Sequence, residues 1–202
     1  MQNPIRRNRN IGKTQGGRIQ NGRAYEKWSR NKFLSDSYAK LSDSDEIWQV
    51  YQQNPSRNYF HPNQSYEYIE VLNQLPDNLT QYVKAILLPR ISKSDVNKGV
   101  DAKKRFNCIL INPFPISMEM VWKSKPVKAT FQHYEPWCNF WKPKNEQWIL
   151  QWNLAQLKRY YLYHLFLHEL GHINQPCYHS RRKREEFAEN FALEWARKLG
   201  QL

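Results

Sequence analysis

His168-Glu169-Leu170-Gly171-His172 lies near the end of a long amphipathic stretch and decides how the rest of the sequence is interpreted. Two histidines four positions apart on a helix lie on one face, one turn from each other. Their ring nitrogens can bind one Zn²⁺ ion, and Glu169 then lies beside the metal, where it can act as a general base. The pattern therefore predicts a zinc site with His168 and His172 as ligands and Glu169 as the catalytic group.

The sequence around this motif is typical of a helix. Asn153 is a good N-cap, and Gln156 three positions later completes a capping box. Apolar residues then recur at helical spacing, so we expect one helix from Leu154 to Ile173 that ends before Pro176.

A second helix should begin after Ser180, which is also an N-cap residue, and end near Gly200. One side of this helix carries an aromatic stripe that we expect in the core. Another side carries Ala188, Ala192 and Ala196, and side chains this small let a neighbouring helix approach closely. The sequence therefore predicts two helices packed against each other, with the histidines on the first.

The second helix also offers the third zinc ligand. A catalytic zinc ion takes three protein ligands and keeps one position for water. A third histidine after the motif does not fit, because Gln175 and Tyr178 stand where that pattern needs Gly and His. Glu185 fits, because it lies three positions before Ala188 and hence on the close-packing face. Glu186, about 100° around the helix, is the alternative ligand.

Other residues near the motif have supporting roles. Glu189, one turn after Glu185, could orient a ligating histidine through its second ring nitrogen. Tyr178 and His179 are within reach as donors that stabilise an oxyanion. His164 lies one turn before the motif, and its aromatic neighbours favour a packed, hydrogen-bonded histidine.

His-Glu-Leu-Gly-His followed by Glu-x-x-Ala-x-x-Phe-Ala from Glu185 resembles the minimal gluzincins, in particular the peptidases related to the ImmA/IrrE group. The resemblance covers about residues 147–196. It implies an α+β fold with a small zincin-like core, in which a short β-sheet packs on the HExxH helix and a following helix carries a ligand. It also implies Zn²⁺ bound by His168, His172 and Glu185, with Glu169 as general base in peptide-bond hydrolysis. Where the family has Asn or Asp, this chain has Glu189.

The preceding sequence predicts short elements. We expect helices over about 43–53 and from residue 64 or 65 to Leu75, a helical turn at Asp77, strands at 83–88 and 106–112, and a polar loop over 91–104. Residues 127–134 could form a further strand, and residues 147–152 an edge strand. If that edge lies beside the metal, it could hold an extended peptide by strand addition.

Positive charge is concentrated near the start of the chain. The 202 residues carry a net charge of +13, and residues 1–34 hold nine Lys or Arg against one acid, Glu26. Residues 1–25 lack apolar periodicity, so we expect a disordered basic arm over 1–34 and a single domain over 35–202. The arm and the basic run at 181–184 could bind nucleic acid.

Cys108, Cys138 and Cys177 are too few and too widely spaced for a disulfide framework, which favours a reducing, cytoplasmic compartment. No segment has the apolar length of a secretion signal or a membrane span, so we expect no membrane partner. The sequence therefore favours a zinc metallopeptidase that acts on a protein or peptide. The alternatives are a nucleic-acid-associated protein with a regulatory or non-catalytic zincin core, and a scaffold that uses its Trp-rich middle segment for protein contacts.

Overall fold

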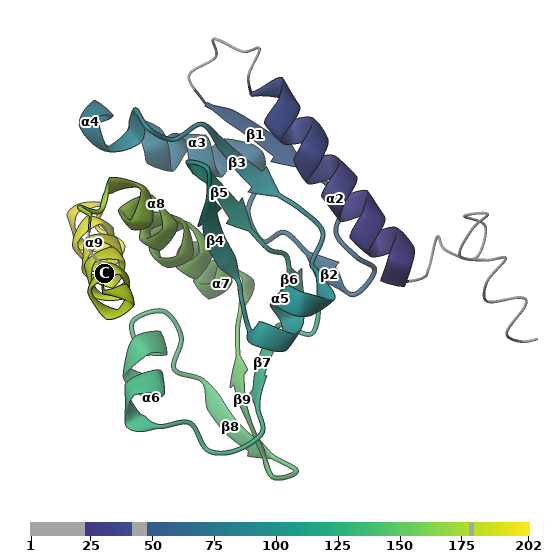
Figure 1. Cartoon of the computed structure of the whole chain (residues 1–202). Coiled ribbons are helices and arrows are strands. Elements are labelled where there is room, and N and C mark those ends of the chain that lie inside the picture. The colour runs from purple at the N-terminus through teal and green to yellow at the C-terminus, as the bar shows by residue number, and fades with distance from the viewer. Residues whose placement is uncertain (1–22, 42–47, 178–179) are drawn as a thin grey trace, which may run out of the picture.

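The chain folds around a four-stranded sheet with the strand order β1-β3-β5-β4 (Figure 1). The computed structural model describes residues 23–41, 48–177 and 180–202. β1 (Gln49–Gln52), β3 (Ala85–Leu88) and β5 (Cys108–Ile111) are parallel, and β4 (Ala102–Arg105) pairs antiparallel with β5 at one edge. Every residue of β3 and β5 is buried, so both faces of the sheet are covered.

Successive side chains of the buried strands enter two different cores, as the two-residue period of a strand requires. Ile86 and Ile109 belong to the larger core, which includes α3 (Ser65–Asn73) and the C-terminal helices. Leu87 and Leu110 belong to the smaller core on the opposite face. The alternation therefore places a helical layer on each face of the sheet.

Helix α2 (Arg23–Lys40) covers the second face, and its Leu34 is buried in one cluster with Leu87 and Leu110. The disordered arm predicted over residues 1–34 is therefore wrong for residues 23–34. The sequence did not reveal this helix because its apolar positions are few, and their burial depends on a sheet formed much later in the chain. Residues 1–22 lie outside the described residues.

Residues 119–151 form a second, antiparallel sheet in the order β7-β9-β8. Its elements are β7 (Glu119–Trp122), α6 (Lys128–Tyr134), β8 (Trp141–Lys144) and β9 (Gln147–Gln151). The strand predicted at 147–152 is confirmed, but its edge position is wrong, because β9 pairs on both sides. The strand predicted at 127–134 is also wrong. Phe131 and Tyr134 are three positions apart on a helix, and both rings pack against Trp141.

Two further predictions fail because the partners lie far away in the sequence. Residues 49–52 of the helix predicted over 43–53 form β1 by pairing with β3, while residues 42–47 lie outside the described residues. The loop predicted over 91–104 contains β4 and α5 (Lys93–Lys98), whose first turn is capped by the Ser92 hydroxyl.

The remaining predictions for the first half of the chain are confirmed by α3, α4 (Asp77–Thr80), β3 and β5. These segments carry their own signals, which are apolar runs and helix-starting residues close to each element. A short antiparallel pair, β2 (Tyr59–Phe60) with β6 (Phe114–Pro115), was not predicted.

The C-terminal part forms the two helices expected from the sequence. The first is continuous through α7 (Leu154–Tyr160), a π-helical segment η2 (Tyr161–Phe166) and α8 (Leu167–Asn174), and Asn153 and Gln156 form the predicted capping box. The second is α9 (Arg181–Lys198), which packs against α8. Ser180 occupies its N-cap position, but its side chain makes no capping hydrogen bond. The π segment was not predicted.

Two expectations from composition can be compared with the structure. Cys108, Cys138 and Cys177 are free thiols, and only Cys177 is exposed. None of the helices in the described residues combines the length and the apolar character needed to cross a membrane. The cytoplasmic location stays a prediction.

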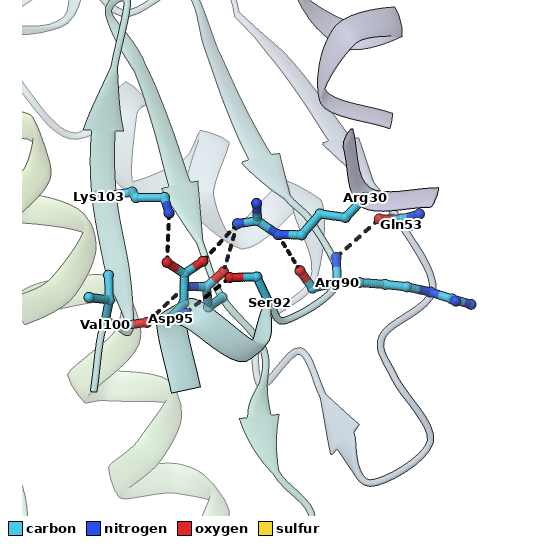
Figure 2. Close-up of polar contacts among 8 residues, drawn as sticks. Arg30, Gln53, Arg90, Ser92, Asp95, Val100 and Lys103 are labelled. Carbon is cyan, nitrogen blue, oxygen red and sulfur yellow. Dashed lines mark hydrogen bonds and ion pairs between the residues drawn. The ribbon is translucent and has the colours of Figure 1, made fainter. Parts of the chain in front are cut away.

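A buried ion-pair network joins α2 to the edge of the main sheet (Figure 2). The Arg30 guanidinium donates to Asp95 Oδ2 at 2.9 Å and to the Arg90 carbonyl at 2.7 Å. Lys103 of β4 donates to Asp95 Oδ1 at 2.8 Å. Arg30 and Asp95 are both buried, so a single carboxylate links α2, α5 and β4.

Replacement of Asp95 by Asn should be strongly destabilising. It leaves the Arg30 guanidinium buried without a counter-charge, and breaking a buried pair in this way costs about 3–5 kcal/mol. Burial alone would raise the pKa of Asp95, but hydrogen bonds from Lys103 and Ser92 and the charge of Arg30 outweigh it and lower the pKa. The stabilisation is therefore complete above the unfolded-state pKa of about 3.9 and is lost as the pH falls through the lower folded-state value.

Urea unfolding of the wild type and Asp95→Asn, followed from neutral to acidic pH, measures both effects. The matched control is Asp36→Asn on α2, which removes an exposed ion pair with Lys32 and should leave stability almost unchanged. Equal stability of the two variants would contradict the role given to the network.

Candidate metal centre

Two histidines of α8 and a carboxylate of α9 meet in space. Nε2 of His168 and Nε2 of His172 each lie 3.6 Å from Glu185 Oε2. The centroids of the two imidazole rings are 4.8 Å apart. These are the three residues predicted as ligands, and the structure brings their donor atoms together from two helices.

The spacing of these donor atoms suits a tetrahedral metal ion. Zinc bonds of about 2.0–2.2 Å to nitrogen and oxygen place neighbouring ligand atoms roughly 3.3 Å apart. The measured separations of 3.6 Å are close to this value. Two imidazoles and one carboxylate are also a donor set that catalytic zinc sites use. The residues therefore fit a zinc ion.

The other ring nitrogen of each histidine has a partner that fixes the ring. His172 Nδ1 lies 3.1 Å from Gln175 Oε1, and His168 Nδ1 lies 3.3 Å from Glu189 Oε2. Both neighbouring atoms are oxygens, at hydrogen-bond distance for His172 and at ion-pair distance for His168. A proton on each Nδ1 would leave Nε2 of a neutral ring free to bind a metal. Support of this kind is usual for metal-ligating histidines, and the structure places Glu189 where the sequence predicted it.

Glu169 lies beside these ligands and lines the same cavity, which has a volume of about 770 Å³. Burial raises the pKa of the Glu169 carboxyl to about 7, against the opposing effects of His168 and of the Lys104 backbone amide. Lys104 belongs to β4, so the edge strand and Glu169 border the same space. A carboxylate is therefore held next to the candidate metal ligands in a pocket that is open to a substrate.

Glu189 is the centre of a second histidine cluster. His164 Nε2 lies 3.1 and 3.0 Å from its two oxygens, and His133 Nδ1 lies 3.4 Å from Oε1. Burial would raise the pKa of Glu189, but hydrogen bonds from His133, His164 and His168 outweigh it and hold the pKa far below its usual value. One carboxylate thus anchors three imidazoles.

The geometry alone would allow a metal ion in either group. The donor atoms of His133, His164 and Glu189, like those of His168, His172 and Glu185, lie within 4.8 Å of one another. In the first of these groups, both carboxylate oxygens of Glu189 already accept hydrogen bonds from His164. We therefore interpret it as the support of His168 and the second group as the metal site.

The close approach of α8 and α9 depends on Gly171. A Cβ atom at this position would lie 3.0 Å from Ala188 Cα and 3.3 Å from the Ala188 carbonyl oxygen. The backbone of α9 cannot move out of the way as a flexible side chain could. Gly171, the fourth residue of the motif, is therefore what lets Glu185 reach the two histidines.

His164 is carried by the π-helical segment η2. The ring is buried, stacks on Tyr160 with centroids 5.1 Å apart, and contacts Glu189. A π segment inserts a wider turn and changes the direction of the residues that follow, and such segments are frequent at functional sites. The apolar pattern of residues 154–173 fits a regular helix, so the π segment could not be predicted from it.

Some predicted site residues are not part of this arrangement. Tyr178 and His179, the candidates for oxyanion stabilisation, lie outside the described residues. Among the described residues, the groups that could hold a metal include neither Glu186 nor Cys177. Glu185 is thus the α9 carboxylate that the geometry favours.

Sequence reasoning missed two residues that line the cavity, His133 and Asp101. His133 belongs to α6, which was predicted as a strand, and Asp101 lies in the segment predicted as a loop. Burial raises the pKa of the Asp101 carboxyl to about 6. His133 could have been recognised as a candidate. The chain has only six histidines, and three of them lie in or next to the motif, so each remaining histidine was worth considering for the same site.

No protein-family model matches the chain, and comparison with curated proteins and with solved structures finds no match either.

Gly171→Ala should lower the affinity for zinc. The added methyl group forces α8 and α9 apart, which moves Glu185 away from the histidines, and overpacking of this kind costs about 1–3 kcal/mol of stability. Zinc affinity by chelator competition, with thermal unfolding in parallel, measures both consequences. Asn190→Ala on the exposed side of α9 is the control, and wild-type zinc affinity in Gly171→Ala would contradict this account.

Glu189→Gln should weaken zinc binding without removing a metal ligand. The amide loses the charge that holds His168 and His164, and the loss of such a supporting group typically costs about 10–100-fold in metal affinity. The same competition assay measures the change. Glu194→Gln removes an exposed carboxylate of the same helix and should bind zinc like the wild type.

Proposed function

We propose that this protein is a zinc-dependent metallopeptidase of the minimal gluzincin type, with a zincin-like core. The observation that carries the proposal is the convergence of His168, His172 and Glu185 at metal-ligand spacing, with Glu169 in the same cavity. The resemblance of the two sequence motifs to those of the ImmA/IrrE-related peptidases also supports it.

His168, His172 and Glu185 would hold the ion through Nε2, Nε2 and Oε2. A bound zinc ion would supply Lewis acidity, which polarises a carbonyl group and lowers the pKa of water towards about 7. His168 and His172 are oriented for this role by Glu189 and Gln175.

Glu169 would move the protons of the reaction. Its carboxylate accepts a proton from the attacking water and passes one to the leaving amine, so that the group returns to its starting state after each turnover. The side chain is only 8% exposed, and this burial holds it against the cavity instead of in bulk solvent. Tyr178 and His179 remain the predicted donors to the oxyanion.

The open edge of β4 offers a place for the substrate. Within the described residues β4 pairs only with β5, and the Lys104 amide on this strand reaches Glu169. An extended peptide can add to such an edge through main-chain hydrogen bonds. β4 therefore takes the part that the sequence had assigned to residues 147–152.

The nucleic-acid-associated alternative draws support from one observation, the exposed basic residues Arg181–Arg184 at the start of α9. In that case the zincin core would be regulatory or would act on a DNA-bound protein. Nucleic-acid binding that weakens with salt and requires residues 1–25 would favour it.

Glu169→Gln should keep zinc but abolish turnover. The amide cannot accept the proton, while the metal ligands stay intact, so a loss of about 10²-fold or more in kcat is expected. Metal analysis and hydrolysis of a mixed peptide library measure the two properties. Glu185→Ala is the complementary variant, and it should lose zinc affinity first.

Three results would count against the proposal. Unchanged hydrolysis by Glu169→Gln would remove Glu169 from the mechanism. Full zinc retention by Glu185→Ala would point to another ligand, such as Glu186 or Cys177. Zinc binding by the wild type without hydrolysis of any peptide would favour the scaffold.

A further inference from the structure

Basic side chains border the cavity from two separate elements. β4 contributes Lys103, Lys104 and Arg105, and the first turn of α9 contributes Arg181 and Arg184. The two elements lie on different sides of α8 (Figure 1). A ligand that enters the cavity beside Glu169 therefore passes cations on both walls.

These cations differ in the contacts that their side chains already make within the protein. Lys103 is bound to the buried Asp95 at 2.8 Å and is not available to a ligand. Lys104 donates to the His172 carbonyl at 3.3 Å but stays exposed. The Arg105 guanidinium lies 5.8 and 5.2 Å from the rings of Tyr38 and Phe106. Tyr38 belongs to α2, so Arg105 is directed to the face of the sheet that α2 covers, and Lys104 is the cation of β4 that faces α8.

The arginines of α9 make the weakest contacts within the protein. Arg181 is 87% exposed in its side chain and lies 3.9 Å from Glu185 Oε1, a long contact that a metal ion on Glu185 would weaken. Arg184 is exposed, and in the described part of the chain no carboxylate lies within ion-pair distance of it. Positive charge in a first turn is also disfavoured by the helix dipole, so the fold gains nothing from these residues. Residues that oppose a local structural preference, such as cations at a helix N-terminus, tend to occur where function requires them.

The acids of the cavity do not neutralise this charge at its opening. Glu185 faces two histidine nitrogens at 3.6 Å, and Glu189 is shared by three imidazoles. Glu169 is buried. Asp101 also lines the cavity and is half-buried. Besides Glu185, which is 52% exposed but faces the histidines, the exposed charged side chains that line the cavity on this side of the sheet are therefore Lys104, Arg181 and Arg184.

We propose that the cavity takes an acidic peptide segment, with Asp or Glu on one or both sides of the bond that is cleaved. Lys104 would contact a carboxylate on one wall, and Arg181 and Arg184 on the other. Guanidinium groups bind carboxylates through paired hydrogen bonds, and exposed positive charge at the opening of a cavity attracts anionic ligands. This inference rests on the proposed peptidase function and adds the substrate class.

A peptide fits the observations better than a nucleic acid. The edge of β4 presents main-chain groups that an extended peptide can pair with, and a polynucleotide has no such complement. A cavity of about 770 Å³ admits a few residues of peptide but not a duplex.

The test uses three matched fluorogenic peptides that carry Glu, Gln or Lys around the same cleavable bond. With the zinc-loaded full chain at low salt, kcat/KM for the Glu peptide should exceed that for the Gln peptide by about ten-fold, mainly through KM. The Lys peptide should be the poorest, and the differences should shrink as salt is added.

Arg184→Glu should remove most of the preference for the Glu peptide, measured as the ratio of kcat/KM for the Glu and Gln peptides within the same variant. A glutamate in the first turn suits the helix dipole, so α9 should stay folded. Arg197→Glu, in the last turn of the same helix, makes the same change of charge away from the cavity and should keep the preference. Lys104→Gln tests the opposite wall, and it should weaken the preference in the same direction.

The outcomes separate the two proposals. Equal hydrolysis of the three peptides overturns the acidic preference and leaves the peptidase standing. If none is hydrolysed, the peptidase proposal fails, and fluorescence anisotropy of the same peptides with zinc-loaded Glu169→Gln still decides whether the cavity selects acidic ones. Tighter binding of a single-stranded oligonucleotide than of the Glu peptide, lost in Arg184→Glu, would overturn the inference in favour of nucleic acid.

Discussion

The contact between Gly171 and Ala188 is the constraint on which the candidate site depends. The ligand atoms of His168 and His172 belong to one helix and that of Glu185 to another, so their 3.6 Å separations exist only at one distance between the helix axes. That distance is set where a missing Cβ on α8 meets the backbone of α9. Small residues at this point therefore allow both the close packing of the two helices and the convergence of the three donor atoms.

The same contact explains why Glu189 can serve three histidines. One turn after Glu185, it faces the part of the first helix that contains the π segment, and the altered turn there presents His164 to it. His133 reaches it from α6, which the aromatic cluster around Trp141 holds against the second sheet. Three elements that are separate in the sequence thus depend on a single carboxylate. In return, His168 is held with its Nε2 towards the cavity.

The sequence allowed the convergence of the candidate ligands to be predicted but not their surroundings. His168, Glu169, His172 and Glu185 follow from spacing along two helices, and helical spacing is local information. β4, α6 and α2 could not be found this way, because each depends on partners far away, such as Asp95 for Arg30 and Lys103. His133 and Asp101 were missed with them, since a residue cannot be assigned to a site before its element is placed. Glu189 is intermediate: its position on α9 was clear, whereas its contacts with His133 and His164 required the fold.

A distinction among the basic residues follows from these contacts. Lys103 neutralises a buried carboxylate, and Lys104 binds a carbonyl in the last turn of α8, where the helix dipole favours a cation. The charge of Lys103 therefore has a structural cause, and Lys104 has a structural contact while its side chain stays exposed. Arg181 and Arg184 have no comparable cause, because they lie at the end of α9 where the dipole opposes them and they contact no buried group. This positive charge is not required by the fold, and it lies at the opening of a cavity that holds a buried carboxylate beside the candidate metal ligands. Its purpose must therefore be sought in a ligand.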